Sequence, residues 1–285
     1  MDSRTRNTSH ALAATEFEFR HRFFVIAFIF FAGFEFYWID QSATGIWLAQ
    51  LFRGHPLNLA QAGDRHMLQA IYWAAALVVI VAAWLRTWAA AYLPSRIVHS
   101  TLLHQESVIA DGPYRHLRNP LYLGGILLAA GIGVAASRSG FCFIVGAVIV
   151  FYYRLIFREE PELVAAQGDA YRRFAAAVPR LIPSLRPRLP ASGARPEWQQ
   201  AVRGELFMWL FAASSAIFAA TLSGRMFMIA TCISVAVAAV NGALIGRQRK
   251  RGDAAAPPRG ISSSGLLQEP TEPAQLTRTK RSTKE

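Results

Sequence analysis

The stretch IYWAAALVVIVAAWL, from Ile71 to Leu85, decides the fold class of this chain. It contains no charged residue, and it lies within a longer, predominantly apolar run from about Leu68 to Leu93. A helix needs about 20 predominantly apolar residues to cross a hydrocarbon core that is roughly 30 Å thick. The run is long enough, so it predicts a membrane-spanning helix and an integral membrane protein.

The composition of the chain agrees with this interpretation. The sequence has 285 residues, of which 53% are hydrophobic, and its formal net charge is +12. In a membrane protein, an excess of arginine is typical of cytoplasmic loops, so no nucleic-acid partner is expected. Cys142 and Cys232 lie inside apolar runs and have no metal-ligand spacing, so no metal site is expected.

Other apolar runs are also candidates for membrane spans. The first follows Arg20 and Arg22 and lacks a small-residue cleavage signature, so it is interpreted as a retained helix rather than a signal peptide. We predict an all-α fold, a multi-pass transmembrane helical bundle of about six spans. The predicted spans cover about Phe23–Ile39, Leu68–Leu93, Leu121–Ser137, Phe141–Phe157, Leu206–Leu222 and Met226–Ile245.

The distribution of arginine predicts the orientation of these spans. Arginines are frequent in the N-terminal segment, in the loop 94–120, in the connection 158–203 and in the tail, which opens with RQRKR. Because cytoplasmic loops carry the excess of basic residues, both termini and these two connections are expected to face the cytoplasm. The inner membrane of a bacterium is the expected location.

A cytoplasmic amphipathic helix is expected after the fourth span. Pro161 cannot extend the preceding helix without losing a backbone hydrogen bond, but it suits the start of a new helix. Apolar and aromatic residues then recur at helical spacing as far as Val178. The predicted division of the chain is 1–22 (cytoplasmic segment), 23–93 (two spans), 94–185 (catalytic core), 186–246 (an added pair of spans) and 247–285 (a disordered basic tail).

The first polar cluster is Arg118-Asn119-Pro120-x-Tyr122-x-Gly124, directly before the third predicted span. Pro120 suits the first turn of a helix, so Arg118 and Asn119 would lie beside exposed backbone N–H groups. A helix N-terminus favours an anion such as a carboxylate, to which an arginine adds a bidentate contact. The alternative is that the arginines anchor lipid headgroups and that Tyr122 is an interfacial aromatic residue.

The second polar cluster is Glu159-Glu160, at the end of the fourth predicted span. Adjacent residues differ by about 100° around a helix, so only one of the two points easily into a given pocket. We expect Glu159 to point inward and Glu160 toward arginines. Arg154 lies deeper in the span, where a charge usually faces a cavity or a partner. The alternative is a surface network of Arg154, Arg158 and Glu162 at four-residue spacing.

These clusters resemble a known family. The stretch GPYRHLRNPLYLG, a span, and then REEPELVAAQGDAYRRFAAAVPRLIP are similar to the isoprenylcysteine carboxyl methyltransferase and phospholipid methyltransferase group. The resemblance covers roughly Ser95–Pro183 and implies S-adenosylmethionine as cofactor. Arg118, Arg154 and Glu159 are the expected catalytic residues. The cofactor-binding residues that it implies are Val108, Ile109, Tyr114, Arg118, Asn119, Pro120, Tyr122, Glu159 and Glu160.

The sequence departs from the isoprenylcysteine enzymes at two positions. Asn119 stands where they carry histidine, and asparagine is neither a cation nor a general base. A substrate-binding arginine expected four residues before the first glutamate falls on Leu155, with Arg154 one position away. These departures leave the substrate open.

The predicted function is methyl transfer from S-adenosylmethionine to a lipophilic acceptor that enters from the bilayer. The acceptor would resemble an isoprenylcysteine carboxylate, a phospholipid amine or a small hydrophobic molecule. Methyl transfer needs alignment and exclusion of water more than strong acid–base groups. Two alternatives stay open: an NADPH-dependent membrane reductase of the sterol-reductase type, which has a similar Pro-x-Tyr motif, and a non-catalytic membrane protein with a decayed pocket.

Overall fold

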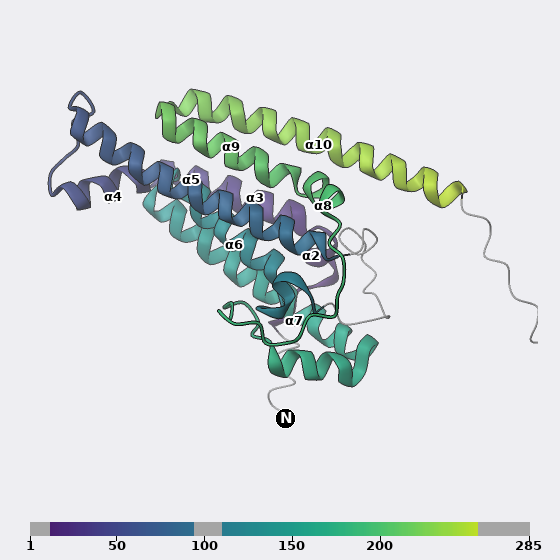
Figure 1. Cartoon of the computed structure of the whole chain (residues 1–285). Helices are drawn as coiled ribbons and strands as arrows, with labels where there is room; N and C mark the ends of the chain where they lie inside the picture. Colours follow the sequence, from purple (N-terminus) through teal and green to yellow (C-terminus); the bar gives the residue numbers. More distant parts are fainter. Residues whose placement is uncertain (1–11, 94–109, 256–285) are drawn as a thin grey trace, which may run out of the picture. The chain divides into compact units, whose positions relative to one another are not determined.

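A computed structural model describes residues 12–93 and 110–255 (Figure 1). Every regular element in these residues is a helix, and the one β-bridge pairs Ala43 with Ser137, so the all-α prediction is confirmed. The α-helices are α2 (Glu16–Arg20), α3 (Arg22–Glu35), α4 (Thr44–Arg53), α5 (Ala62–Ala91), α6 (Pro120–Gly133), α7 (Arg138–Ala177), α8 (Trp198–Gly204), α9 (Leu206–Thr221) and α10 (Gly224–Ala255). Two 3-10 helices, η1 (Phe36–Trp38) and η2 (Gly112–Arg115), lie between them.

The number of spans is lower than the six predicted. Among the described residues, α5, α7 and the part of α10 over Gly224–Leu244 are long and apolar enough to cross a membrane. The pair α8 and α9, bent by 61°, makes a fourth candidate if it counts as one span. The first and third predicted spans fail because α3 and α6 are each 14 residues long. At 1.5 Å per residue they reach about 21 Å, short of a hydrocarbon core of roughly 30 Å.

Helix α7 does not end where the sequence predicted. It continues through Pro161, which removes one backbone hydrogen bond without stopping the helix, and it is interrupted at Gly168 (φ 56°, ψ −131°). Glycine adopts this conformation because it has no Cβ. After the kink, Tyr171 and Phe174 are buried in a cluster with Val178. The expected amphipathic segment is therefore the second part of α7.

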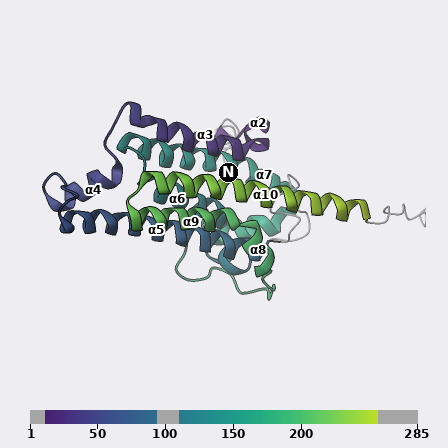
Figure 2. The ribbon, with the colours of Figure 1, turned by 90° about the horizontal axis from the view of Figure 1, so that it is seen from above.

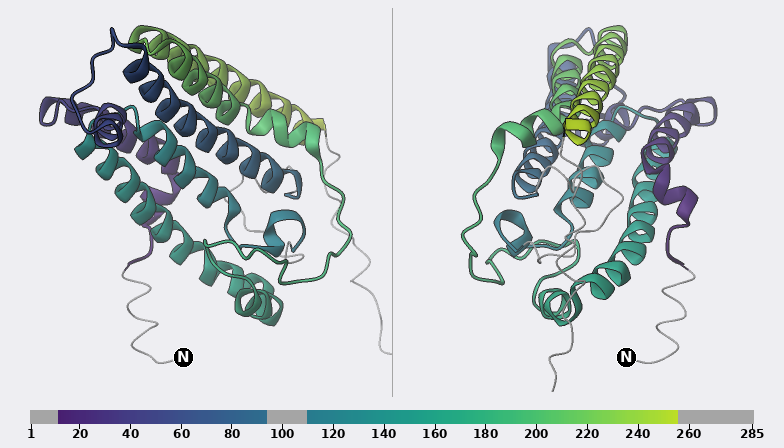
Figure 3. Two further views of the ribbon diagram at one scale, coloured as in Figure 1. Left: turned by 60° about the vertical axis from the view of Figure 1, so that its left-hand side comes forward. Right: turned by 90° about the vertical axis from the view of Figure 1, so that its right-hand side faces the viewer.

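Helix α5 lies at the centre of the bundle, where it packs against α6, α9, α8 and α4 (Figure 3). Gly131 of α6 permits a close approach, because a Cβ at this position would lie 2.5 Å from Cγ2 of Val79. Helix α3 packs against α7 (Figure 2), where Ile144 occupies the space left by Gly33. The glycines of these helices therefore serve close helix packing.

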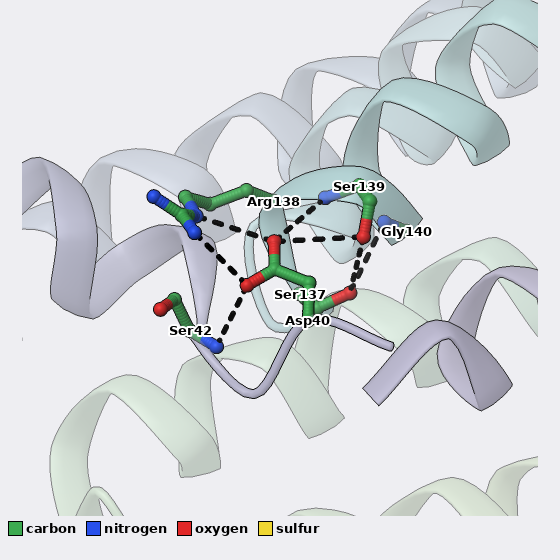
Figure 4. A network of polar contacts seen from close by, with 6 residues as sticks. All are labelled: Asp40, Ser42, Ser137, Arg138, Ser139 and Gly140. Carbon is green, nitrogen blue, oxygen red and sulfur yellow. Dashed lines mark hydrogen bonds and ion pairs between the residues drawn. The ribbon is translucent and has the colours of Figure 1, made fainter. Parts of the chain in front are cut away.

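The start of α7 is fixed by the Asp40 network, which comprises Asp40, Ser42, Ser137, Arg138, Ser139 and Gly140 (Figure 4). Asp40 accepts hydrogen bonds from the Arg138 guanidinium at 3.1 and 3.2 Å and from the backbone N–H groups of Ser42 and Ser139. The Arg138 hydrogen bonds contribute most to lowering the pKa of Asp40 to about 2. The network joins the segment after η1 to the turn between α6 and α7.

Helix α10 continues to Ala255, so the tail predicted to be disordered from residue 247 begins as helix. Its part beyond residue 243 belongs to a separate unit of the chain. Residues 256–285 lie outside the described part.

Candidate active site

The candidate site is built at the start of α6 and near the middle of α7. Pro120 is the first residue of α6, where its fixed φ suits the helix and its missing N–H costs nothing. Asn119 precedes it with φ −124° and ψ 59°, and its side chain does not cap the helix. Tyr122 therefore projects from the first turn of α6, and Arg118 lies just before it.

The two polar clusters meet, although they are far apart in the sequence. The hydroxyl of Tyr122 donates a hydrogen bond to Oε1 of Glu159 at 2.7 Å. Nη1 of Arg118 lies 3.0 Å from Oε1 of Glu160. These two contacts place the segment 118–122 directly against the middle of α7.

The adjacent glutamates have different partners. Glu160 forms ion pairs with Arg118 and with Arg180, whose Nη2 lies 2.7 Å from Oε2 of Glu160. The hydrogen bonds that the Arg180 guanidinium donates to Glu160 also raise the pKa of Arg180. Among the described residues, Glu159 forms no ion pair and its carboxylate is contacted by Tyr122. Glu160 is thus neutralised within the protein, whereas Glu159 has no ion-pair partner among the described residues.

The tyrosine that contacts Glu159 packs against a second aromatic ring. The ring centroids of Tyr122 and Tyr152 are 4.9 Å apart. Gly125 allows this approach, because a Cβ there would lie 2.6 Å from Cε2 of Tyr152. Tyr114 is buried nearby, and burial raises the pKa of its hydroxyl. A carboxylate beside aromatic faces is an arrangement that suits a cationic group.

A segment that we call the strap, residues 179–194, runs along the loop 111–119. Backbone atoms of the strap pair with backbone atoms of the loop, as in Arg118 N–H to the carbonyl of Pro179 (2.8 Å) and Ser184 N–H to the carbonyl of His116 (2.9 Å). The side-chain amide of Asn119 donates to the carbonyl of Arg180 at 3.1 Å. The strap therefore holds Arg118 and Asn119 in place beside α6.

Asp111 fastens the far end of the strap. It accepts hydrogen bonds from the backbone N–H groups of Ser192 (2.8 Å) and Ala194 (2.9 Å) and from the Ser192 hydroxyl. The hydroxyl contact contributes most to lowering the pKa of Asp111. Asp111 thus anchors the strap at the residue that precedes η2.

Comparison with models of known protein families gives a match to part of the chain. Residues 70–169 match the family model described as phospholipid methyltransferase. This segment is a phospholipid methyltransferase domain. The match agrees with the predicted resemblance to the isoprenylcysteine and phospholipid methyltransferase family. No curated protein and no solved structure matches the chain.

The methyltransferase domain contains Tyr114, Arg118, Asn119, Pro120, Tyr122, Arg154, Glu159 and Glu160. It ends before the strap, although Arg180 of the strap contacts Asn119 and Glu160 of the candidate site. Val108 and Ile109 also fall within the domain, but they lie outside the described residues. The site is therefore assembled partly from the domain and partly from the chain that follows it.

Arg154 lies apart from the Arg118–Glu160 contact. Its Nη2 pairs with Glu18 of α2 at 2.7 Å, and this hydrogen bond lowers the pKa of Glu18. Arg158 pairs with Glu16 of α2 and with Glu162, at 3.5 Å, one helical turn later. The four-residue spacing predicted as a surface network is thus present for Arg158 and Glu162, and α2 supplies the other carboxylates.

Sequence reasoning missed three residues at or behind the site: Tyr152, Arg180 and Arg86. Tyr152 resembles any aromatic residue of a span, and Arg180 is one of many arginines in its connection, so neither gave a signal. Arg86 did give one, because it is the only charged residue between Met67 and Leu93. Charges inside apolar spans are rare and usually functional.

Proposed function

We propose that the chain is an integral membrane methyltransferase that transfers a methyl group from S-adenosylmethionine to a lipophilic acceptor. The observation that carries the proposal is the pairing pattern of the adjacent glutamates within a methyltransferase domain. Glu160 is bound by two arginines, whereas Glu159 is contacted by a tyrosine and forms no ion pair among the described residues. This pattern leaves one carboxylate, at a fixed position, for a cationic or hydroxyl-bearing ligand.

The residues present fit the chemical groups of this cofactor. Glu159 would accept hydrogen bonds from the amino group or the ribose hydroxyls. The Nε atom of Arg118 is buried and has no hydrogen-bond partner in the described part of the chain, so it is available to a carboxylate. The Asn119 side chain does not cap α6, so the first backbone N–H groups of α6 are available to the same carboxylate. The faces of Tyr122 and Tyr152 suit the sulfonium cation.

Methyl transfer requires the protein mainly to position the donor and the acceptor. When bound, S-adenosylmethionine supplies a methyl group on a sulfonium sulfur, which is already a good leaving group. The side chains would align donor and acceptor and exclude water, and a strong base is not required. An amine acceptor would have to be neutral before it attacks.

We further propose that the acceptor is an amine in preference to a carboxylate. Arg154 and Arg158 are the arginines on the α2 side of α7, and Glu18 and Glu16 already neutralise them. An acidic acceptor would have to displace these carboxylates, whereas an uncharged amine would not. The arginine distribution supports an orientation with both termini in the cytoplasm, and we place the protein in a bacterial inner membrane.

The test is cofactor binding by purified protein in detergent, with Glu159→Gln as the variant and Glu162→Gln as the matched control. A hydrogen bond to a charged group contributes about 1.5–3 kcal/mol, so Glu159→Gln should weaken binding of S-adenosylmethionine by roughly 10- to 100-fold. Glu162→Gln should bind as the wild type does. Unchanged affinity in Glu159→Gln would show that the site is wrongly assigned, and binding of NADPH instead would favour the reductase.

The acceptor is identified by product analysis. The protein is incubated with a methyl-labelled donor and a bacterial lipid extract, and the labelled products are separated and measured by mass spectrometry. Label in an aminophospholipid supports the amine acceptor. Label in a carboxyl methyl ester would contradict it, and no label in any lipid would contradict a lipophilic acceptor.

A further inference from the structure

Arg86 is a charged residue buried where α5, α6 and the α8–α9 junction meet. Its side chain is 15% exposed, and it pairs with Glu205, whose side chain is 2% exposed. Glu205 is itself the only acidic residue between Glu197 and Asp253. It lies beyond the methyltransferase domain, which ends at residue 169. The pair therefore joins the domain to the helices that follow it.

The guanidinium of Arg86 binds two elements at once. Nε and Nη2 donate to the two carboxylate oxygens of Glu205 at 2.7 and 3.0 Å, which is a bidentate contact. Nη1 donates to the carbonyl of Leu121 at 2.9 Å. Because the guanidinium is planar and rigid, Glu205 fixes the direction in which Nη1 points.

Gly124 accounts for the path of the Arg86 side chain. A Cβ at Gly124 would lie 3.0 Å from Cδ of Arg86 and 3.2 Å from the carbonyl of Ala82. Any larger residue would press on the arginine or on the α5 backbone. The glycine two residues after Tyr122 is therefore the point at which Arg86 passes α6.

Leu121 links this contact to the candidate site. It directly precedes Tyr122, which donates to Glu159, and it packs against the buried cluster that contains Tyr114. A shift of the first turn of α6 would move Tyr122 relative to Glu159. The Leu121 carbonyl is thus a point through which a distant ion pair can set the geometry of the site.

We propose that Arg86, oriented by Glu205, is a positioning residue that holds the first turn of α6 and thereby the Tyr122–Glu159 contact. The C-terminal helices complete the site through Glu205. The cofactor-affinity and turnover readouts of this proposal rest on the proposed function, whereas its amide-exchange readout does not. A buried ion pair adds little stability compared with a well-packed apolar pair, so stability alone does not account for it.

The main variant is the double substitution Arg86→Met with Glu205→Met, which leaves no unpaired buried charge. Melting in detergent should stay close to the wild-type temperature. The affinity for S-adenosylmethionine should fall at least tenfold, and turnover should fall by on the order of 100-fold, the loss expected for a misplacement of about 1 Å. Amide hydrogen exchange at Leu123–Gly125 should become faster.

Thr87→Val is the matched control. It removes the hydrogen bond from Nε1 of Trp209 to the Thr87 hydroxyl (3.0 Å), which also joins α9 to α5 but does not touch α6. This variant should melt at a lower temperature and keep the cofactor affinity of the wild type. Equal losses of affinity in both variants would mean that any weakening of the α5–α9 contact suffices, and this would overturn the specific role of Arg86.

Arg86→Lys serves if the double variant does not fold. The compact ammonium still pairs with Glu205 but does not reproduce the two-sided contact of the guanidinium, so affinity should again fall. Affinity within twofold of the wild type in the folded variant would overturn the proposal. If the wild type binds no S-adenosylmethionine, the proposed function fails. Amide exchange at Leu123–Gly125 then decides the role of Arg86, and unchanged exchange would overturn it.

Discussion

We expect substitution of Glu160 to lower stability and substitution of the adjacent Glu159 to weaken cofactor binding. The variant Glu160→Gln tests the effect on stability. Breaking a buried ion pair by removing one partner costs about 3–5 kcal/mol. The side chain of Arg118 is 12% exposed, whereas that of Arg180 is 36% exposed and in part hydrated. Glutamine also keeps a hydrogen-bond acceptor. We therefore expect a loss of about 2 kcal/mol in the free energy of unfolding, below the usual range for a fully buried pair.

This free energy can be read as a melting temperature. For a chain of this size, 1 kcal/mol corresponds to a shift of about 2–4 °C, so Glu160→Gln should melt about 4–8 °C below the wild type. Glu159→Gln removes no ion pair among the described residues and should shift melting by less than about 2 °C. The assay is thermal unfolding in one detergent, followed by tryptophan fluorescence.

The test compares the stability and the cofactor affinity of these two variants. Glu160→Gln should be less stable but should retain most of its cofactor affinity at a temperature where it is folded. Glu159→Gln should be stable and bind poorly. The reverse pattern, or equal melting temperatures in the two variants, would refute the assignment of one glutamate to the fold and the other to the ligand.

Two further predictions concern the scaffold. Because the pKa of Asp40 is lowered to about 2, its charge contributes stability above the ordinary aspartate pKa of 3.8, and this is lost as pH falls toward 2. The melting temperature of Asp40→Asn should therefore lie below that of the wild type at pH 7, and the two should converge near pH 2; a constant difference would count against the Arg138 contact. Gly125→Ala should displace the Tyr152 ring and lower cofactor affinity severalfold, because its Cβ would lie 2.6 Å from Cε2; wild-type affinity would mean that the ring does not border the ligand.

The sequence allowed the fold class to be predicted, but not the number of spans. Long apolar runs identify helices, yet they do not show where a helix stops. The run from Phe23 was expected to cross the membrane as far as Ile39, and α3 ends at Glu35. In α7, proline was expected to break the helix, and the break occurs at Gly168, where a positive φ is required. Backbone conformation of this kind depends on packing as well as on composition.

The residues of the candidate site were more predictable from the sequence than the ion-pair partners of its arginines. Placing Arg118, Tyr122 and the glutamates near one another followed from their motifs, and Glu160 does face arginines as expected. The pairing of Arg154 with α2 was not foreseen, because contacts between residues 136 positions apart leave no local pattern. Arg86 and Glu205 are 119 positions apart, and each was visible only as an isolated charge.

The strap has a consequence for how proteins of this kind diverge. Most of its contacts with the loop 111–119 use its own main-chain atoms, including the carbonyls of Pro179 and Arg180 and the N–H groups of Ser184 and Arg188. Such contacts specify the path of the polypeptide and leave most side chains along it unconstrained. Two relatives can therefore share the strap while their sequences differ almost completely along it. Sequence similarity then ends before the last segment that contacts the candidate site.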